Sequence, residues 1–290
     1  MRLLSVLLCL ALPACGARTP LAEEETGHDA GPILDAQTDA SSDASKSDCT
    51  DPSITYVYVV TESARVYSFK PATGIFALIG ALDCPAHAGE TPFSMGVDRK
   101  GNAYVVYSNG DLFRASTATG HCKATGFQPG AQGFIRFGMG FSTDQGGPSE
   151  KLYLAASETY GSPYPPALGW LDTATYEPHA IAYIADTGME LTGTGDGRLY
   201  GFFDNGVAAH LVQLDKKTGQ YLTDTTLPGV SKGSAWAFAF WGGDFWFFTA
   251  PAGTSTVTRY QPSSKKIEVV GILPSEQIVG AGVSTCAPEQ

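Results

Sequence analysis

The sequence predicts an all-β domain built from repeated four-stranded units. Three observations support this fold class. Charged residues make up only 16% of the chain, whereas it contains 34 glycines and 11% aromatic residues. This composition is typical of short strands and tight turns rather than amphipathic helices. The other two observations are sequence elements that recur at similar intervals along the chain.

The first recurring element is a strand that ends in a tight turn. Its copies occupy residues 67–74, 113–120, 169–176 and 212–219, and a weaker fifth copy occupies residues 258–265. Asp, Ser or Pro usually opens the turn, and Gly closes most copies. This pattern is typical of a four-residue hairpin loop with a left-handed position.

The second recurring element is a strand of small residues, then a Gly/Asp turn, then an aromatic-rich strand. It occupies residues 94–107, 138–154, 190–203 and 236–248. Each unit therefore has four antiparallel strands and repeats every 43 to 56 residues, which matches a β-propeller blade. Small residues suit inner strands that converge on an axis. A β-sandwich, or a propeller of different blade number, is the alternative, but a sandwich does not explain small residues in the same strand of every unit.

The ends of the repeat region predict how the ring closes. The region starts with a second strand at residues 55–60 and ends with an unpartnered inner strand at residues 278–284. Pairing these two strands completes a fifth blade and removes the exposed edges of an open sheet. The prediction is a five-bladed propeller over residues 49–290, closed by its N- and C-terminal strands.

Residues 1–14 have the pattern of a signal peptide. Arg2 precedes an apolar run that is too short to span a bilayer as a permanent helix. The run ends in Leu12-Pro13-Ala14-Cys15, which resembles the bacterial lipobox. The resemblance implies that Cys15 is acylated, with palmitate or a similar chain, and anchors the mature protein in the lipid bilayer. Gly16 after the cysteine favours the outer membrane. An ordinary secretory signal with a free Cys15 thiol is the alternative.

Residues 15–48 form the expected linker between the anchor and the domain. Residues 16–48 contain eight acidic residues against Arg18 and Lys46, and they contain no aromatic residue. Such a segment cannot bury enough apolar surface to fold, so a disordered acidic tether is predicted, with a binding tail as the alternative. The whole chain carries a net charge of −11 and no Lys/Arg run, which excludes nucleic acid as a partner.

The remaining cysteines predict disulfides. Cys49 and Cys286 flank the two strands that are expected to pair, so they lie at the same hairpin turn and can form a bridge. Such a bridge requires an oxidising compartment, which export supplies. Cys84–Cys122 follows only by elimination. The expected strand order places these two cysteines toward opposite ends of adjacent outer strands, and two free thiols are the alternative.

The sequence matches to catalytic and metal-binding motifs are better explained as structural features of loops and turns. The G-x-S-x-G match at residues 229–233 lacks the strand and helix of a nucleophile elbow, and the Gly-rich residues 193–197 open no helix. The histidines show no metal-binding spacing, so neither a metal nor a cofactor is expected, with a metal site assembled across blades as the alternative. Aspartates recur at the turns between first and second strands, where Asp bonds its own backbone; calcium ligation is the alternative. They are Asp98, Asp144, Asp196 and Asp244.

One mouth of the predicted channel is a candidate binding rim. Loops from every blade converge there on a rigid base, as at the binding sites of many folds. Three acids, an arginine, a serine and a tryptophan suit a sugar or a cationic peptide, although a plain solvated rim has the same composition. The rim residues are Glu90, Arg136, Glu190, Ser234, Trp236 and Glu276.

Segments 92–99, 190–196, 233–243 and 279–286 resemble uncharacterised propeller-like lipoproteins of myxobacteria and their relatives. The resemblance carries no known activity and no catalytic residues that could be transferred to this chain. The expected function is that of a lipid-anchored cell-envelope protein with a non-catalytic binding or scaffolding propeller and a protein or glycan partner. The alternative is a glycan hydrolase or lactonase that uses carboxylates at the channel mouth. A structural envelope component is a third possibility.

Overall fold

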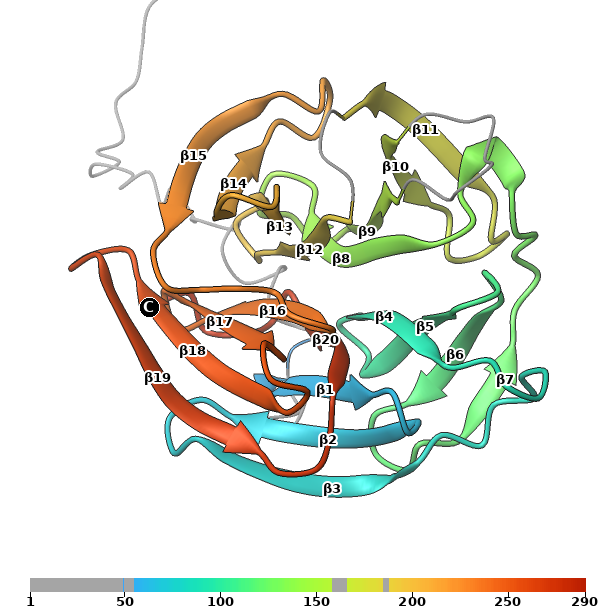
Figure 1. Ribbon diagram of the computed structural model, residues 1–290. Coiled ribbons are helices and arrows are strands. Elements are labelled where there is room, and N and C mark those ends of the chain that lie inside the picture. The colour runs from blue at the N-terminus through green and yellow to red at the C-terminus, as the bar shows by residue number, and fades with distance from the viewer. Residues whose placement is uncertain (1–48, 50–54, 158–165, 185–187) are drawn as a thin grey trace, which may run out of the picture. The chain divides into compact units, whose positions relative to one another are not determined.

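The computed structural model describes Cys49 and residues 55–157, 166–184 and 188–290. Within these residues, twenty strands form five four-stranded antiparallel sheets, the blades (Figure 1). The strands from the axis outward are, in blade 1, β20 (Ile278–Val283), β1 (Val57–Thr61), β2 (Arg65–Lys70) and β3 (Ile75–Ala81). In blade 2 they are β4 (Pro92–Val97), β5 (Asn102–Tyr107), β6 (Leu112–Ser116) and β7 (Cys122–Ala124).

The other three blades repeat this order. Blade 3 contains β8 (Phe137–Thr143), β9 (Glu150–Ala156), β10 (Ala167–Leu171) and β11 (Pro178–Tyr183). Blade 4 contains β12 (Glu190–Gly193), β13 (Leu199–Asp204), β14 (Ala209–Leu214) and β15 (Tyr221–Leu227). Blade 5 contains β16 (Trp236–Trp241), β17 (Asp244–Thr249), β18 (Ser255–Gln261) and β19 (Lys266–Leu273), and a 3-10 turn, η2 (Ala131–Gly133), precedes blade 3.

The ring is closed by the two ends of the domain. Figure 1 shows the red strand β20 beside the blue strand β1, and the two pair antiparallel with Val57 opposite Val283 and Val59 opposite Ala281. Each inner strand also packs against the inner strands of both neighbouring blades. The predicted five-bladed propeller and its closure are confirmed, and the alternatives of a sandwich or another blade number are wrong.

The small residues of the inner strands are explained by the narrow axis. A Cβ atom on Gly138 would overlap the carbonyl oxygen of Met189, and one on Gly140 would lie 2.7 Å from the carbonyl oxygen of Leu191. Real Cβ atoms do not approach backbone this closely. The backbones of β8 and β12 therefore touch, and glycine is required at these positions.

The outer hairpin turns explain the first recurring element. One residue of each turn has a positive φ, and in four of them its N–H donates to the carbonyl four residues earlier. Glycine suits this left-handed conformation because it has no Cβ. These residues are Gly74 (φ 68°), Gly120 (77°), Tyr176 (61°), Gly219 (70°) and Lys265 (55°). The weaker copy at residues 258–265 thus has the same local geometry.

Aromatic and aliphatic side chains fill the spaces between blades. Phe69 of blade 1 meets Phe248 of blade 5 edge-on, with ring centroids 5.5 Å apart. Phe202 of blade 4 lies 5.7 Å from Phe238 of blade 5. All six residues of β17 are buried, as expected for a strand covered on both faces. Aromatic pairs of this kind stabilise by about 0.5–1.5 kcal/mol each beyond their burial.

The described residues form two disulfides, Cys49–Cys286 with Cα atoms 5.5 Å apart and Cys84–Cys122 with Cα atoms 4.6 Å apart. The expectation that Cys84 and Cys122 lie toward opposite ends of neighbouring strands was wrong. Strand twist accumulates across a blade, so the outer strand is strongly tilted. The end of β3 consequently reaches the start of β7 in the next blade, where Asp83 Oδ1 accepts a hydrogen bond of 2.6 Å from the Cys122 N–H.

Two disulfides indicate an extracytoplasmic protein, because such bonds persist in oxidising compartments. The predicted signal peptide, Cys15 and the linker at 16–48 lie outside the described residues. Within the described residues, no helix has the length and hydropathy needed to cross a bilayer.

Candidate binding site at the channel mouth

A pocket of about 230 Å³ lies where the chain enters the inner strands. Four of the six predicted rim residues line it: Arg136, Glu190, Ser234 and Trp236. The pocket receives residues from all five blades, so it lies on the axis of the ring. Its other lining residues, which the sequence did not single out, are Glu62, Thr91, Pro92, Phe93, Ser108, Ala235 and Val279.

Arg136 supplies positive charge to the pocket. It directly precedes β8, and its guanidinium carbon lies 5.4 Å from the centroid of the Phe93 ring. This cation–π contact holds the guanidinium near the ring without using its N–H donors. In the part of the chain that the structure describes, no carboxylate forms an ion pair with Arg136. Its charge therefore remains available to a bound molecule.

Glu190 is the buried acid of the pocket. It is the first residue of β12 and only 4% exposed. Ser94 Oγ, from β4, donates to Glu190 Oε2 at 2.8 Å, and the same Ser94 oxygen accepts from the Met139 N–H of β8 at 3.2 Å. This chain of contacts joins blades 2, 3 and 4 across the axis.

Burial raises the pKa of Glu190 well above its usual value, and the Ser94 hydrogen bond lowers it only in part. Burial thus favours the protonated carboxyl. Because Oε2 already accepts from Ser94, the proton belongs on Oε1. Among the described residues, Oε1 has no hydrogen-bond partner, so its O–H can donate to a molecule in the pocket.

Trp236 forms an apolar wall of the pocket and is held in place by its ring nitrogen. Its Nε1 donates to the Gly188 carbonyl at 2.9 Å, and Lys232 Nζ lies 4.8 Å from its ring centroid. Ser234 is exposed, and its Oγ donates to Gln277 Oε1 at 2.8 Å. The wall is therefore fixed before any ligand arrives.

The other two predicted rim residues do not line the pocket. Glu90 bonds Ser108, which does line it, so Glu90 lies just behind the wall. Glu276 is buried and accepts from Ser63 Oγ at 2.7 Å and from Arg65 Nη1 at 2.9 Å. The turn before β20 directs the Glu276 side chain toward β2 rather than the axis, where it stabilises blade 1.

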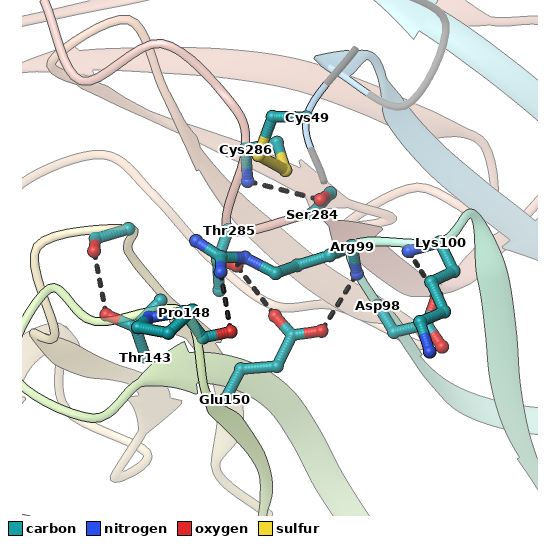
Figure 2. Close-up of a disulfide and its surroundings, with 11 residues drawn as sticks. Cys49, Asp98, Arg99, Lys100, Thr143, Pro148, Glu150, Ser284, Thr285 and Cys286 are labelled. Carbon is teal, nitrogen blue, oxygen red and sulfur yellow. Dashed lines mark hydrogen bonds between the residues drawn. A yellow bond between two sulfur atoms is a disulfide. The ribbon is translucent and has the colours of Figure 1, made fainter. Parts of the chain in front are cut away.

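At the end of the inner strands opposite this pocket, the C-terminal residues form hydrogen bonds with neighbouring blades (Figure 2). Thr285 Oγ1 donates to Glu150 Oε2 at 2.6 Å and accepts from Arg99 Nε at 3.0 Å. Glu150 Oε1 accepts from the Arg99 N–H at 2.8 Å. The Gly242 N–H donates to the Pro288 carbonyl at 2.7 Å.

The C-terminal residues thus bond blades 2, 3 and 5, and the Cys49–Cys286 disulfide holds them beside β1. The sequence alone does not predict this hydrogen-bond network, because its partners are far apart in the chain: Arg99 and Thr285 are separated by 186 residues.

Of the four predicted turn aspartates, Asp98 uses its side chain to bond the backbone of its own turn, whereas Asp144 accepts from Ser149 Oγ and Asp196 pairs with Arg198. Asp98 Oδ1 accepts from the backbone N–H groups of Lys100 and Asn102 at 2.9 and 2.8 Å. Asp244 instead pairs with Arg259 of the neighbouring strand. Within the described residues, no three His, Cys, Asp or Glu side chains gather into a cluster that could hold a metal ion.

No protein-family model and no curated protein sequence matches the chain. Among solved structures, it is similar to a chain of a nidogen/laminin complex, with a TM-score of 0.52 and 11% identity over 78% of this chain and 97% of that one. The chain is also similar to TolB from Acinetobacter baumannii, with a TM-score of 0.45 and 15% identity over 76% of this chain and 54% of that one. A TolB-like protein from Agrobacterium tumefaciens has a TM-score of 0.42 and 12% identity over 74% of this chain and 69% of that one.

At these identities the nidogen/laminin likeness shows the propeller fold alone. The two TolB likenesses are too distant to carry an argument. The resemblance to myxobacterial lipoproteins finds no support in a family match.

Proposed function

We propose that this chain is a lipid-anchored cell-envelope protein whose propeller binds a ligand, without catalysis, in the pocket at the channel mouth. The observation that carries the proposal is the convergence of all five blades on one pocket with a fixed tryptophan, a stacked arginine and a buried acid. A rigid base that presents such groups is typical of a binding site.

The contacts of the carboxylates favour binding over glycan hydrolysis. Hydrolysis requires an acid and a second carboxylate that flank the scissile bond, about 5–10 Å apart. Glu190 bonds Ser94, Glu90 lies behind the pocket wall, and Glu276 is committed to Arg65. Glu62 is the second acid of the pocket, and it is exposed at the rim rather than buried opposite Glu190.

The proposed anchor is an acylated Cys15 in the outer membrane, with residues 16–48 as a tether. Anchoring of this kind requires two or more acyl chains, which a modified N-terminal cysteine supplies. Metabolic labelling with a palmitate analogue tests it: wild type is expected to incorporate label and to fractionate with outer membranes, and Cys15→Ala is expected to do neither. Equal labelling of both proteins would contradict the anchor.

The binding role is tested by affinity purification from solubilised envelopes. Wild type is compared with Trp236→Ala and with Trp170→Ala, a matched control whose tryptophan stacks on His179 in blade 3, away from the pocket. Trp236→Ala is expected to lose a bound component that the control retains. Retention of every component by Trp236→Ala would overturn the proposal.

A further inference from the structure

We infer that the ligand of this pocket presents a carboxylate, which pairs with Arg136 and accepts a hydrogen bond from Glu190. The inference rests on the proposed binding function and specifies its ligand class. It is carried by the position of a stacked arginine and a buried acid in the same small cavity.

The charges of the pocket favour an anion. The ionisable groups that line it with Glu190 are Arg136 and Glu62, and Lys232 lies against the outer wall that Trp236 forms. Glu62 is exposed, so water screens its charge, whereas Arg136 is half-buried and stacked on Phe93. A guanidinium with free N–H donors binds carboxylates in two-pronged geometry, and such charge-assisted bonds are about twice as strong as neutral ones.

The hydrogen-bond geometry of Glu190 also favours an acceptor ligand. Ser94 Oγ accepts the Met139 N–H, so its own proton points to Glu190 Oε2. The protonated carboxyl then has one remaining donor, Oε1–H, at the pocket. An ionised Glu190 would repel a carboxylate, but burial disfavours that form.

A cationic ligand fits the same groups poorly. An amine in the pocket would lie near Arg136 and would need an ionised Glu190, which requires a charge to be buried at 4% exposure. The cavity of about 230 Å³ and the faces of Trp236 and Phe93 suit a short apolar tail behind the carboxylate. Both a small organic acid and the C-terminus of a partner protein meet this description.

Isothermal titration calorimetry on the purified full-length protein tests the ligand class with three probes of matched shape: butanoate, butylamine and butanamide. Butanoate is expected to bind at least tenfold more tightly than the amine or the amide. A tetrapeptide with a free C-terminus, compared with its amidated form, separates the two carboxylate sources. Tighter binding of the amine, or no binding of either carboxylate probe, would overturn the inference.

Two variants assign the roles. Arg136→Gln is expected to weaken binding of the carboxylate at least tenfold, whereas the control Arg114→Gln, an exposed arginine of β6 outside this pocket, is expected to leave it unchanged. Equal affinity of Arg136→Gln and wild type for the carboxylate would show that Arg136 does not bind it. Melting temperatures of both variants establish that they fold.

The role of Glu190 is tested by the pH dependence of carboxylate affinity. This measurement also tests the inference if Arg136→Gln fails to fold. Above about pH 6 the probe stays ionised, so a fall in the affinity of wild type as the pH rises further reports the ionisation of Glu190, whose pKa is raised by burial. Glu190→Gln retains a donor but cannot ionise, so its affinity is expected to show no such fall. The same dependence of affinity on pH in both proteins would show that Glu190 does not donate to the carboxylate. If no carboxylate binds but Trp236→Ala still loses its component, the ligand class is wrong and the binding function stands.

Discussion

Removal of the Cys49–Cys286 disulfide is the perturbation that reports most directly on how the ring is closed. The bond joins residues 237 positions apart and holds the C-terminal residues beside β1. In the Cys49→Ser/Cys286→Ser variant, the β1–β20 ladder and the Thr285 contacts to Arg99 and Glu150 remain available. We therefore expect the variant to fold, with lower stability.

The magnitude follows from loop closure in the unfolded chain. For a separation of 237 residues, the chain-entropy model gives about 5 kcal/mol at 25 °C. The Cys84–Cys122 bond spans 38 residues, and the same model gives about 4 kcal/mol. These values are upper bounds for the two double variants. The closing disulfide is expected to contribute more because its loop contains almost the whole domain.

Urea denaturation of wild type and both double-serine variants, followed by tryptophan fluorescence, measures these losses. The expected order of unfolding free energies is wild type, then Cys84→Ser/Cys122→Ser, then Cys49→Ser/Cys286→Ser. The loop-closure reasoning would be refuted if loss of the Cys49–Cys286 bond cost less than loss of the Cys84–Cys122 bond.

Three further outcomes are expected. Burial raises the pKa of Glu150 to about 7 from 4.5, so its stabilising contribution is complete below about pH 4.5 and is lost as pH rises through 7, by up to about 3 kcal/mol. Glu150→Gln should flatten this decline in urea melts, and an unchanged decline would contradict the assignment. Ser94→Ala should cost about 1–3 kcal/mol, because the buried Met139 N–H and Glu190 Oε2 lose their partner; a thermal melt that matches wild type would exclude this bond. Gly138→Ala should yield little folded protein on expression, because its Cβ overlaps neighbouring backbone, and normal yield with a wild-type melt would contradict the close packing at the axis.

Features set by local sequence were predictable. The hairpin turns follow from residues within one turn, so even the copy that ends at Lys265 adopts the left-handed conformation that its weaker motif predicts. The ring closure was predictable because an unpaired second strand at one end and an unpaired inner strand at the other have only each other as partners. Four pocket residues were found because each lies in or just before the start of an inner strand.

Features set by three-dimensional direction were not predictable. The Cys84–Cys122 bond depends on accumulated blade twist, which strand order alone does not contain. Glu276 has the same sequence position relative to its inner strand as other rim residues, but its side chain turns to Arg65. The hydrogen bond between Thr285 and Glu150 joins blades that are not adjacent in sequence, and no local motif predicts it.

The central claim is that a carboxylate binds at the axis of the ring, between Arg136 and Glu190. A crystal structure of the protein grown with butanoate, or with the free tetrapeptide if that binds more tightly, measures this directly. We expect ligand density in the mouth pocket, with the carboxylate within hydrogen-bond distance of both the Arg136 guanidinium and Glu190 Oε1. A ligand seated elsewhere, or turned with its apolar end toward Glu190, would contradict it.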